Sequence, residues 1–192
     1  ELLRHPHRPL ISLTGVVNGT CNYLFTEKGK PFRVLRRAQS LKLCEPGAKG
    51  LAETVNAEIK DIILKLCILF NLSGVCDECL VPGDLSDVLF AEEEILRLLL
   101  TRRYRLVVSI SPYVPRREPL GVHGRKGSWS IRAEFVDIGS VDFRLPQGAD
   151  NILVCTDCTG DTATAFGPGA GPDVTAAALI ADMLRLIEKR SV

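Results

Sequence analysis

The feature that most constrains this chain is a long run of apolar residues with helical spacing over positions 55–72. The apolar side chains recur every three or four positions, as on a helix face that packs against a core: Val55, Ile59, Ile62, Ile63, Leu66, Leu69 and Phe70. The polar residues occupy the other side: Glu53, Asn56, Glu58, Asp61 and Lys65. The pattern therefore predicts one long helix, around which the remaining elements pack.

Asp61 and Lys65 are four positions apart, so their side chains leave the same face of this helix about one turn apart. One interpretation is a surface ion pair that contributes about 0.3–0.5 kcal/mol. In the other interpretation, a lysine and its carboxylate line a functional site. The helix pattern alone leaves both open.

Composition limits the class of protein. With 192 residues and 46 % hydrophobic residues, the chain can bury a proper core as one domain. Lysine and arginine number 24 against 23 acidic residues, which argues against a binder of nucleic acid or membranes. We find no apolar run of the ~18 residues that span a bilayer and no signal peptide, and therefore expect a cytoplasmic protein. Because the chain begins at Glu1 rather than Met, we expect a processed or truncated piece of a longer protein.

The seven cysteines are an odd number, which favours a reducing compartment. Two C-x-x-C pairs have the ligand count of a structural zinc site: Cys76 with Cys79, and Cys155 with Cys158. The gap between the pairs is far longer than in a compact zinc ribbon, so we expect no metal. Free thiols and disulfides remain the alternatives.

The remaining segments predict an α+β fold with a mixed, largely antiparallel sheet covered by helices. Helices are predicted over 31–43, within 84–101 and over 173–190. A short apolar run predicts a strand over 9–14, and a further strand is predicted over 105–114. Alternating residues predict strands over 129–135 and 141–145, and residues 151–156 and 162–166, which flank a turn at Gly160 and Asp161, predict a hairpin. The basic, Pro- and Gly-rich segment 115–126, which contains His123, predicts an exposed loop.

Two glycine-rich segments lead into predicted helices. In the first, Gly19 stands among Asn18, Thr20 and Asn22. In the second, glycines over 167–171 precede Asp173, a plausible N-cap. Such a turn can present free backbone N–H groups to an anionic ligand, or it can simply start a helix.

These motifs resemble those of homoserine dehydrogenases. Residues 15–23 resemble G-x-x-N-G-T-T-N-Y, with Cys21 in place of the second threonine. Ala38 and Glu45 fall within a segment similar to A-Q-x-x-G-x-A-E-x-D-P, and the long helix ends like D-x-x-x-K-x-x-I-L. Residues 167–176 resemble the closing G-x-G-A-G…T-A. The resemblance implies NAD(P)-dependent interconversion of aspartate semialdehyde and homoserine, in threonine and methionine biosynthesis.

The resemblance also implies roles for individual residues. Lys65 would be the catalytic ammonium and Asp61 would orient it. The implied substrate-binding residues are Glu45, Glu53, Asn56, Gly19 and Thr20, with Glu53 a rival for the role of Glu45. The implied cofactor-binding residues are Asn18, Gly167, Gly169, Ala170, Gly171 and Thr175. If the family motif is aligned from Glu45 without a gap, the catalytic lysine falls at Lys60. If this chain has extra residues near 47–51, the alignment recovers Asp61 and Lys65 together. We prefer the second alignment.

The order of the motifs implies a domain organisation. Residues 1–166 would form a substrate-binding, catalytic and dimerisation domain, and 167–192 would supply a glycine loop and a helix that complete a nucleotide-binding domain. No G-x-G-x-x-G follows a strand in this chain, so a domain outside it would hold most of the NAD(P). We expect a homodimer that binds a small-molecule substrate. The alternatives are a non-catalytic or regulatory homologue, and a half-enzyme that needs a separate nucleotide-binding partner.

Overall fold

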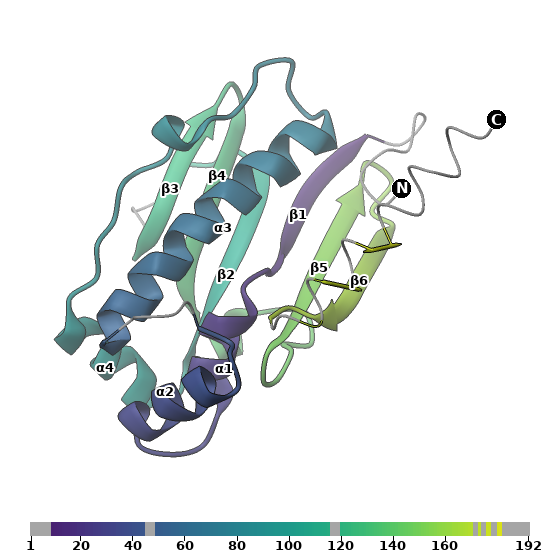
Figure 1. The fold of residues 1–192 in the computed structure, drawn as a ribbon. Coiled ribbons are helices and arrows are strands. Elements are labelled where there is room, and N and C mark those ends of the chain that lie inside the picture. The colour runs from purple at the N-terminus through teal and green to yellow at the C-terminus, as the bar shows by residue number, and fades with distance from the viewer. Residues whose placement is uncertain are drawn as a thin grey trace.

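One six-stranded sheet forms the framework of the computed structural model (Figure 1), which describes residues 9–44, 49–115 and 120–170 together with 173, 176, 177, 180 and 181. The strands are β1 (Leu10–Val16), β2 (Tyr104–Pro112), β3 (Gly121–Lys126), β4 (Trp129–Asp137), β5 (Asp150–Asp157) and β6 (Thr162–Pro168). Their order in the sheet is β3-β4-β2-β1-β5-β6. Every pairing between them is antiparallel, which confirms the predicted α+β class.

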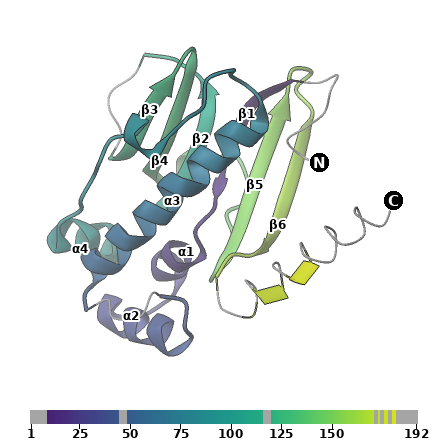
Figure 2. The ribbon, with the colours of Figure 1, turned by 45° about the horizontal axis from the view of Figure 1, so that its top comes forward.

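Four helices accompany the sheet in the described part of the chain: α1 (Gly19–Thr26), α2 (Pro31–Ser40), α3 (Leu51–Ser73) and α4 (Glu92–Thr101). The long helix α3 crosses one face of the sheet, while α1 and α2 lie together at one end of it (Figures 1 and 2). Among the described helices, none has the length and apolarity that crossing a membrane requires.

The main core lies between α3 and the sheet. The predicted apolar stripe of α3 is buried along its length, with Val55, Ile59, Ile62, Leu66 and Phe70 at most 1 % exposed. The long-helix prediction is thus confirmed, and the helix begins at Leu51, earlier than the pattern indicated. Gly74 ends α3 in the left-handed conformation, with φ of 65°, which glycine adopts without steric cost.

The predicted loop over 115–126 is wrong in its second half, because residues 121–126 form the edge strand β3. His123 pairs in register with Arg132 of β4, and the His123 backbone N–H donates to the Ser86 hydroxyl at 2.9 Å. The glycines and basic residues of this segment obscure the alternation that is typical of a strand. Its strand conformation becomes apparent only in the pairing with β4. Edge strands often carry such charged residues.

The predicted strand over 141–145 is also wrong. Val141, Phe143 and Leu145 do share one side, but they cover a small second core around Val16, Val107 and Ile152 without entering the sheet. Alternation along β1, β2 and β5 places this second core on the face opposite α3. The alternating pattern of residues 141–145 therefore comes from a connecting segment that packs over the sheet, and not from a strand within it.

The predicted division of the chain after residue 166 falls inside β6, and Gly167 pairs with Asn151 of β5. Of the predicted C-terminal helix over 173–190, the structure describes residues 173, 176, 177, 180 and 181, and the side chain of Ile180 is exposed.

Candidate active site

The junction between β1 and α1 is built around Asn18. This residue is the N-cap of α1, and its side-chain Oδ1 accepts from the Cys21 backbone N–H at 2.8 Å. Asparagine is among the preferred N-cap residues, because its short polar side chain satisfies a free N–H of the first turn. The sequence thus turns the chain sharply from a strand into a helix and fixes the side chain at the turn.

The other end of the Asn18 amide faces α3. Its Nδ2 donates to Glu58 Oε2 at 2.6 Å and to Asp61 Oδ2 at 3.1 Å. Asn18 is 4 % exposed and Glu58 is 8 % exposed. The amide therefore connects the start of α1 to two carboxylates of the long helix.

Lys65 joins the same group. Its Nζ lies 2.7 Å from Asp61 Oδ2 and donates to the Val17 carbonyl oxygen at 3.1 Å. Its side chain is 37 % exposed and that of Asp61 is 45 % exposed. The ammonium is thus held between a carboxylate and a backbone carbonyl at the edge of the protein, where it remains accessible.

Helix geometry explains why these side chains meet. At about 100° per residue, positions 58, 61 and 65 of α3 fall on one face. Glu58 was grouped with the polar side of the helix in the sequence but had no assigned role. Its spacing of three and seven residues from Asp61 and Lys65 is the signal that identifies it. Its partner Asn18, forty positions away, becomes apparent only in the fold.

The protonation of this group is shifted by burial. Burial raises the pKa of the Glu58 carboxyl, while hydrogen bonds from Asn18 and Thr20 act in the opposite direction. Burial also raises the pKa of the Cys21 thiol well above its usual value and that of Cys44 to about 11. These two thiols therefore stay protonated at neutral pH and are poor nucleophiles.

The two glycine-rich segments meet beside this cluster. A Cβ added to Gly19 would lie 2.4 Å from the Ala149 carbonyl oxygen, 2.7 Å from the Gly169 carbonyl carbon and 2.8 Å from Ala170 Cβ. The Gly169 N–H donates to the same Ala149 oxygen at 2.8 Å. The absence of a side chain at Gly19 thus allows the segment after β6 to lie directly against the start of α1.

Two buried amide oxygens near this contact have no hydrogen-bond partner within the described part of the chain: Asn22 Oδ1 and Asn151 Oδ1. The Asn22 Nδ2 donates to the carbonyl oxygens of Pro146 and Asp150, at 3.2 and 3.1 Å, which fixes the side chain. Asn151 lies so close to Gly169 that a Cβ there would be 2.1 Å from its side-chain Cγ and Oδ1. A buried acceptor without a partner costs about 1–3 kcal/mol, and a ligand N–H donor would remove that cost.

Other predicted site residues lie away from the cluster. Glu53 accepts from the Lys49 backbone N–H at 2.7 Å, and Asn56 exchanges two hydrogen bonds with the Phe90 backbone. Lys60 is exposed. At about 100° per residue, Asn56 and Lys60 lie on the other side of α3 from Glu58, Asp61 and Lys65, and Glu53 lies about a third of a turn around the helix from them. Glu45, Gly171 and Thr175 lie outside the described residues.

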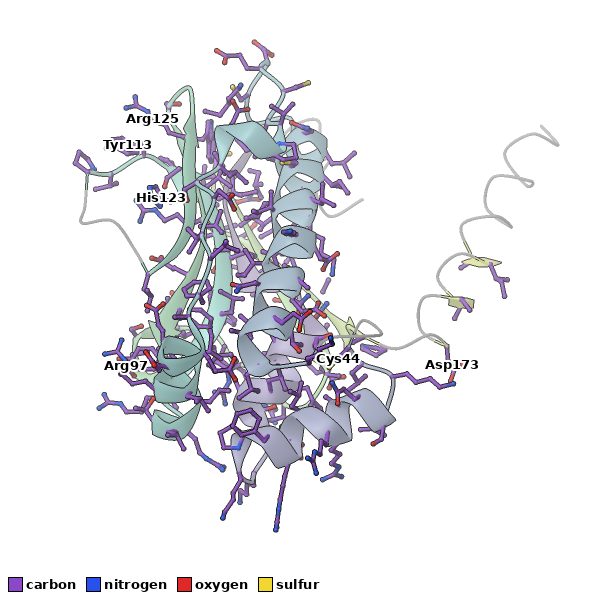
Figure 3. All side chains as sticks on the ribbon, turned by 60° about the vertical axis from the view of Figure 1, so that its left-hand side comes forward. Cys44, Arg97, Tyr113, His123, Arg125 and Asp173 are labelled. Carbon is purple, nitrogen blue, oxygen red and sulfur yellow. The ribbon has the colours of Figure 1, made fainter. Side chains whose placement is uncertain are left out.

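The cysteines are free thiols, and the described residues contain no group of three or more His, Cys, Asp or Glu placed to hold a metal. Cys76 lies by the β3–β4 turn, where a Cβ on Gly127 would be 3.6 Å from its Sγ, and Cys155 lies in β5. Cys44 lies near α2 and α3, far from Tyr113 and Arg125, which stack at 4.3 Å at the other end of the sheet (Figure 3).

One known protein family matches nearly the whole chain. The sequence model of the homoserine dehydrogenase family, described as "Homoserine dehydrogenase", matches residues 4–184. No curated protein sequence matches the chain.

Several solved structures share the fold. A protein described as a homoserine dehydrogenase from Archaeoglobus fulgidus is 22 % identical, with a TM-score of 0.63 over 96 % of this chain and 53 % of that one. The S. aureus homoserine dehydrogenase is 16 % identical, with a TM-score of 0.62 over 97 % of this chain and 44 % of that one. A hyperthermophilic archaeal homoserine dehydrogenase in complex with NADPH is 20 % identical, with a TM-score of 0.60 over 98 % of this chain and 51 % of that one.

The chain thus spans about half the length of these enzymes. The family match covers nearly all of its residues, and the matched segments include both glycine turns and the helix that carries Lys65. The chain therefore belongs to the homoserine dehydrogenase family, a family of oxidoreductases.

Proposed function

We propose that this chain is the substrate-binding half of a homoserine dehydrogenase, which interconverts aspartate semialdehyde and homoserine with NAD(P). The observation that carries the proposal is the placement of Lys65, whose accessible ammonium is held by Asp61 and the Val17 carbonyl, on the α3 face that also contacts Asn18 at the start of α1. The alternative explanation is an isolated surface ion pair between Asp61 and Lys65, and such a pair would not require the contacts with Val17 and Asn18.

The chemistry proposed for Lys65 follows from the charge that develops in the reaction. A bound nicotinamide supplies or accepts the hydride. As the aldehyde carbon gains hydride, negative charge grows on its oxygen, and a positioned ammonium stabilises that charge and supplies the proton of the alcohol. Asp61 keeps the ammonium oriented, and solvent restores its proton because the side chain is partly exposed.

The residues of this chain fit the nicotinamide end of the cofactor. Gly167, Gly169 and Ala170 belong to the segment in which Gly169 and Ala170 pack against Gly19, and the buried Asn151 oxygen beside Gly169 offers an acceptor for a carboxamide N–H. Gly171 and Thr175 continue that segment in the sequence. Both Asn18 amide protons are already used by carboxylates, so Asn18 would position the turn rather than touch the cofactor.

For the substrate, we propose that Thr20, the Gly19 backbone and a carboxylate bind the amino and carboxyl groups. Glu45 remains our candidate for the carboxylate that pairs with the amino group. The hydrogen bonds of Glu53 and Asn56 favour structural roles at the start of α3 instead. A place in threonine and methionine biosynthesis and a cytoplasmic location belong to the same proposal.

Binding and turnover assays test this proposal. We expect homoserine to shift the backbone NMR signals of residues 17–20 in the chain alone, and turnover with NAD(P) to appear only when a nucleotide-binding half from the family is joined to it. Tight NAD(P)H binding by the chain alone would contradict the half-enzyme view. Absence of both homoserine binding and turnover would favour the non-catalytic or regulatory homologue.

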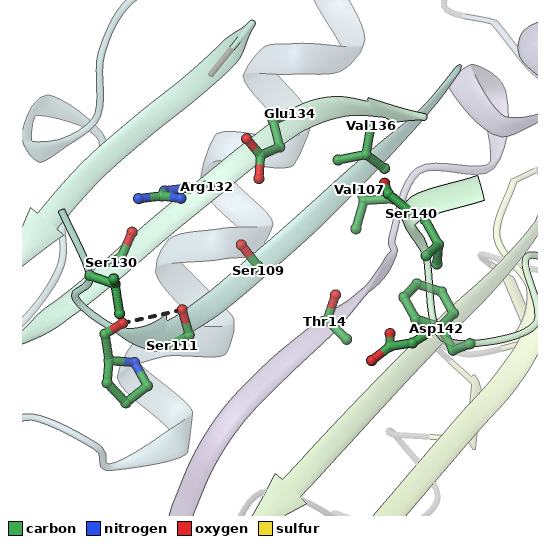
Figure 4. A pocket seen from close by; sticks show the side chains of 14 residues that line it. Thr14, Val107, Ser109, Ser111, Ser130, Arg132, Glu134, Val136, Ser140 and Asp142 are labelled. Carbon is green, nitrogen blue, oxygen red and sulfur yellow. Dashed lines mark hydrogen bonds between the residues drawn. The ribbon is translucent and has the colours of Figure 1, made fainter. Parts of the chain in front are cut away.

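We also propose a homodimer that forms through the sheet face opposite α3. That face carries a hollow lined by apolar side chains such as Val107 and Val136, by small polar ones such as Thr14, Ser109 and Ser130, and by Arg132 and Glu134 (Figure 4). It lies on the other side of the sheet from Lys65. Sedimentation should give twice the chain mass of 21.0 kDa, and Ser109→Arg should give monomers. A wild-type monomer at micromolar concentration would contradict the proposal.

A further inference from the structure

A second carboxylate, Glu58, lies on the inner side of the Asp61–Lys65 pair and has no part in the chemistry proposed above. It is 8 % exposed, and its Oε2 is the nearer of the two carboxylate partners of the Asn18 amide, at 2.6 Å. Among the described residues, no lysine or arginine forms an ion pair with it. A glutamate is a costly residue at such a buried position unless its carboxylate has a function there.

The orientation of the Asn18 amide depends on this carboxylate. The amide oxygen caps α1 at Cys21, and the two N–H groups point at Glu58 and Asp61. A flipped amide would place its oxygen against two carboxylates and its nitrogen against a backbone N–H, so each contact would be repulsive. Glu58 and Asp61 together therefore fix which way Asn18 points.

Asp61 depends in turn on Asn18. A single oxygen of Asp61 accepts from Asn18 at 3.1 Å and contacts the Lys65 ammonium at 2.7 Å. Because the Asp61 side chain is 45 % exposed, water competes for this carboxylate and leaves it free to change rotamer. Asn18 is the buried contact that holds it, and the short hydrogen bond to Glu58 anchors Asn18 from the inner side.

We propose that Glu58 is a positioning residue, which fixes the Asn18 amide from inside the protein and thereby keeps Asp61 and the Lys65 ammonium in place at the accessible end of the cluster. The proposal rests on the proposed function for its effect on turnover. The anchoring of Asn18 itself does not depend on that function and can be measured without substrate or cofactor.

NMR of the Asn18 side-chain amide tests the anchoring directly. In the ¹⁵N-labelled chain, we expect the two Asn18 N–H signals to move with pH as Glu58 gains its proton. Glu58→Gln, whose amide oxygen still accepts from Asn18, should keep the signals separate but remove that transition. Glu93→Gln, an exposed change in the first turn of α4, should leave the transition as in the wild type. An unchanged transition in Glu58→Gln would overturn the proposal.

Turnover separates positioning from a purely structural role. In the chain joined to a nucleotide-binding half, we expect Glu58→Ala to lower kcat about 10- to 100-fold, as for loss of a hydrogen bond to a charged group, with KM changed little. Glu58→Gln should restore most of kcat. If Glu58→Ala unfolds at lower temperature but the folded fraction keeps the wild-type kcat, Glu58 is only structural and the proposal is wrong. If the wild type and the Glu93→Gln variant are themselves inactive, the proposed function has failed, and the Asn18 signals still decide the anchoring.

Stability against pH gives a second readout for the folded chain. The groups facing Glu58 are Asp61 and Lys65 on α3, Cys21 on α1 and Cys44 after α2. Because burial raises the pKa of Glu58 above its ordinary value of 4.5, the folded state holds the proton more tightly than the unfolded state. Stability from this group is present below pH 4.5 and is lost as pH rises through the raised value. As pH rises above 4.5, the free energy of unfolding of Glu58→Gln should therefore increase relative to that of the wild type. A difference between the two proteins that does not change with pH would count against a buried Glu58 that binds a proton.

Discussion

Replacing Lys65 with alanine should lower kcat by about 10²- to 10³-fold in the chain joined to a nucleotide-binding half, because the variant loses the positioned charge that faces the developing alkoxide. The same change should cost little stability. Lys65 and Asp61 are both more than a third exposed, so their ion pair contributes at most about 1 kcal/mol. A large loss of kcat with little loss of stability is what distinguishes a catalytic lysine from a structural one.

Steady-state kinetics and denaturant unfolding, measured on the same preparations, check this result. Lys60→Ala serves as the comparison, because Lys60 lies on the same helix but is exposed on its opposite face. The alternative motif register, which assigns the role to Lys60, predicts the reverse order of effects. A Lys65→Ala enzyme with wild-type kcat would return Asp61 and Lys65 to the role of a surface pair.

Much of the fold could be predicted because its elements carry their own patterns. The stripe from Val55 to Phe70 has helical spacing and is buried as that spacing requires. The hairpin of β5 and β6 is predicted from two segments that flank a turn at Gly160, whose φ of 85° suits that turn. In these cases the residues that determine the element are neighbours in sequence.

The errors arose where the deciding residues lie elsewhere in the chain. The strand character of residues 121–126 comes from β4, and the period-two burial of Val141 and Phe143 comes from Val16 and Val107 beneath them. Neither partner belongs to the segment itself: β3 pairs with the next strand, β4, across a short turn, whereas Val16 and Val107 are far from Val141 in sequence.

The candidate site shows the same division. Motif spacing indicated Asp61 and Lys65, and the structure places them beside Asn18, but the role of Glu58 depends on a hydrogen bond across forty positions. Similarly, the resemblance implied a substrate-binding role for Asn56, whereas its two hydrogen bonds with Phe90 tie α3 to the segment before α4. Sequence spacing locates a helix face well, but it does not reveal which neighbouring element that face meets.

Gly19→Ala should damage both the fold and the site, although alanine is the better helix former by about 1 kcal/mol. The added methyl group would lie 2.4 Å from the Ala149 carbonyl oxygen and 2.7 Å from the Gly169 carbonyl carbon, and both are backbone atoms that cannot rotate away. Overpacking of this kind typically costs about 1–3 kcal/mol, which exceeds the gain in helix propensity. The start of α1 and the segment around Gly169 must therefore separate.

We expect a lower denaturation midpoint and, because Asn18 caps the same turn, weaker binding of homoserine. Gly83→Ala is the matched control, since a Cβ there meets nothing within 4 Å. Denaturant unfolding of the two variants measures the difference in stability, and the NMR signals of Gly169 and Ala170 report whether that segment moves. If Gly19→Ala is as stable as Gly83→Ala and those signals do not shift, the two glycine segments do not pack together, and the proposed placement of the nicotinamide beside Gly19 loses its support.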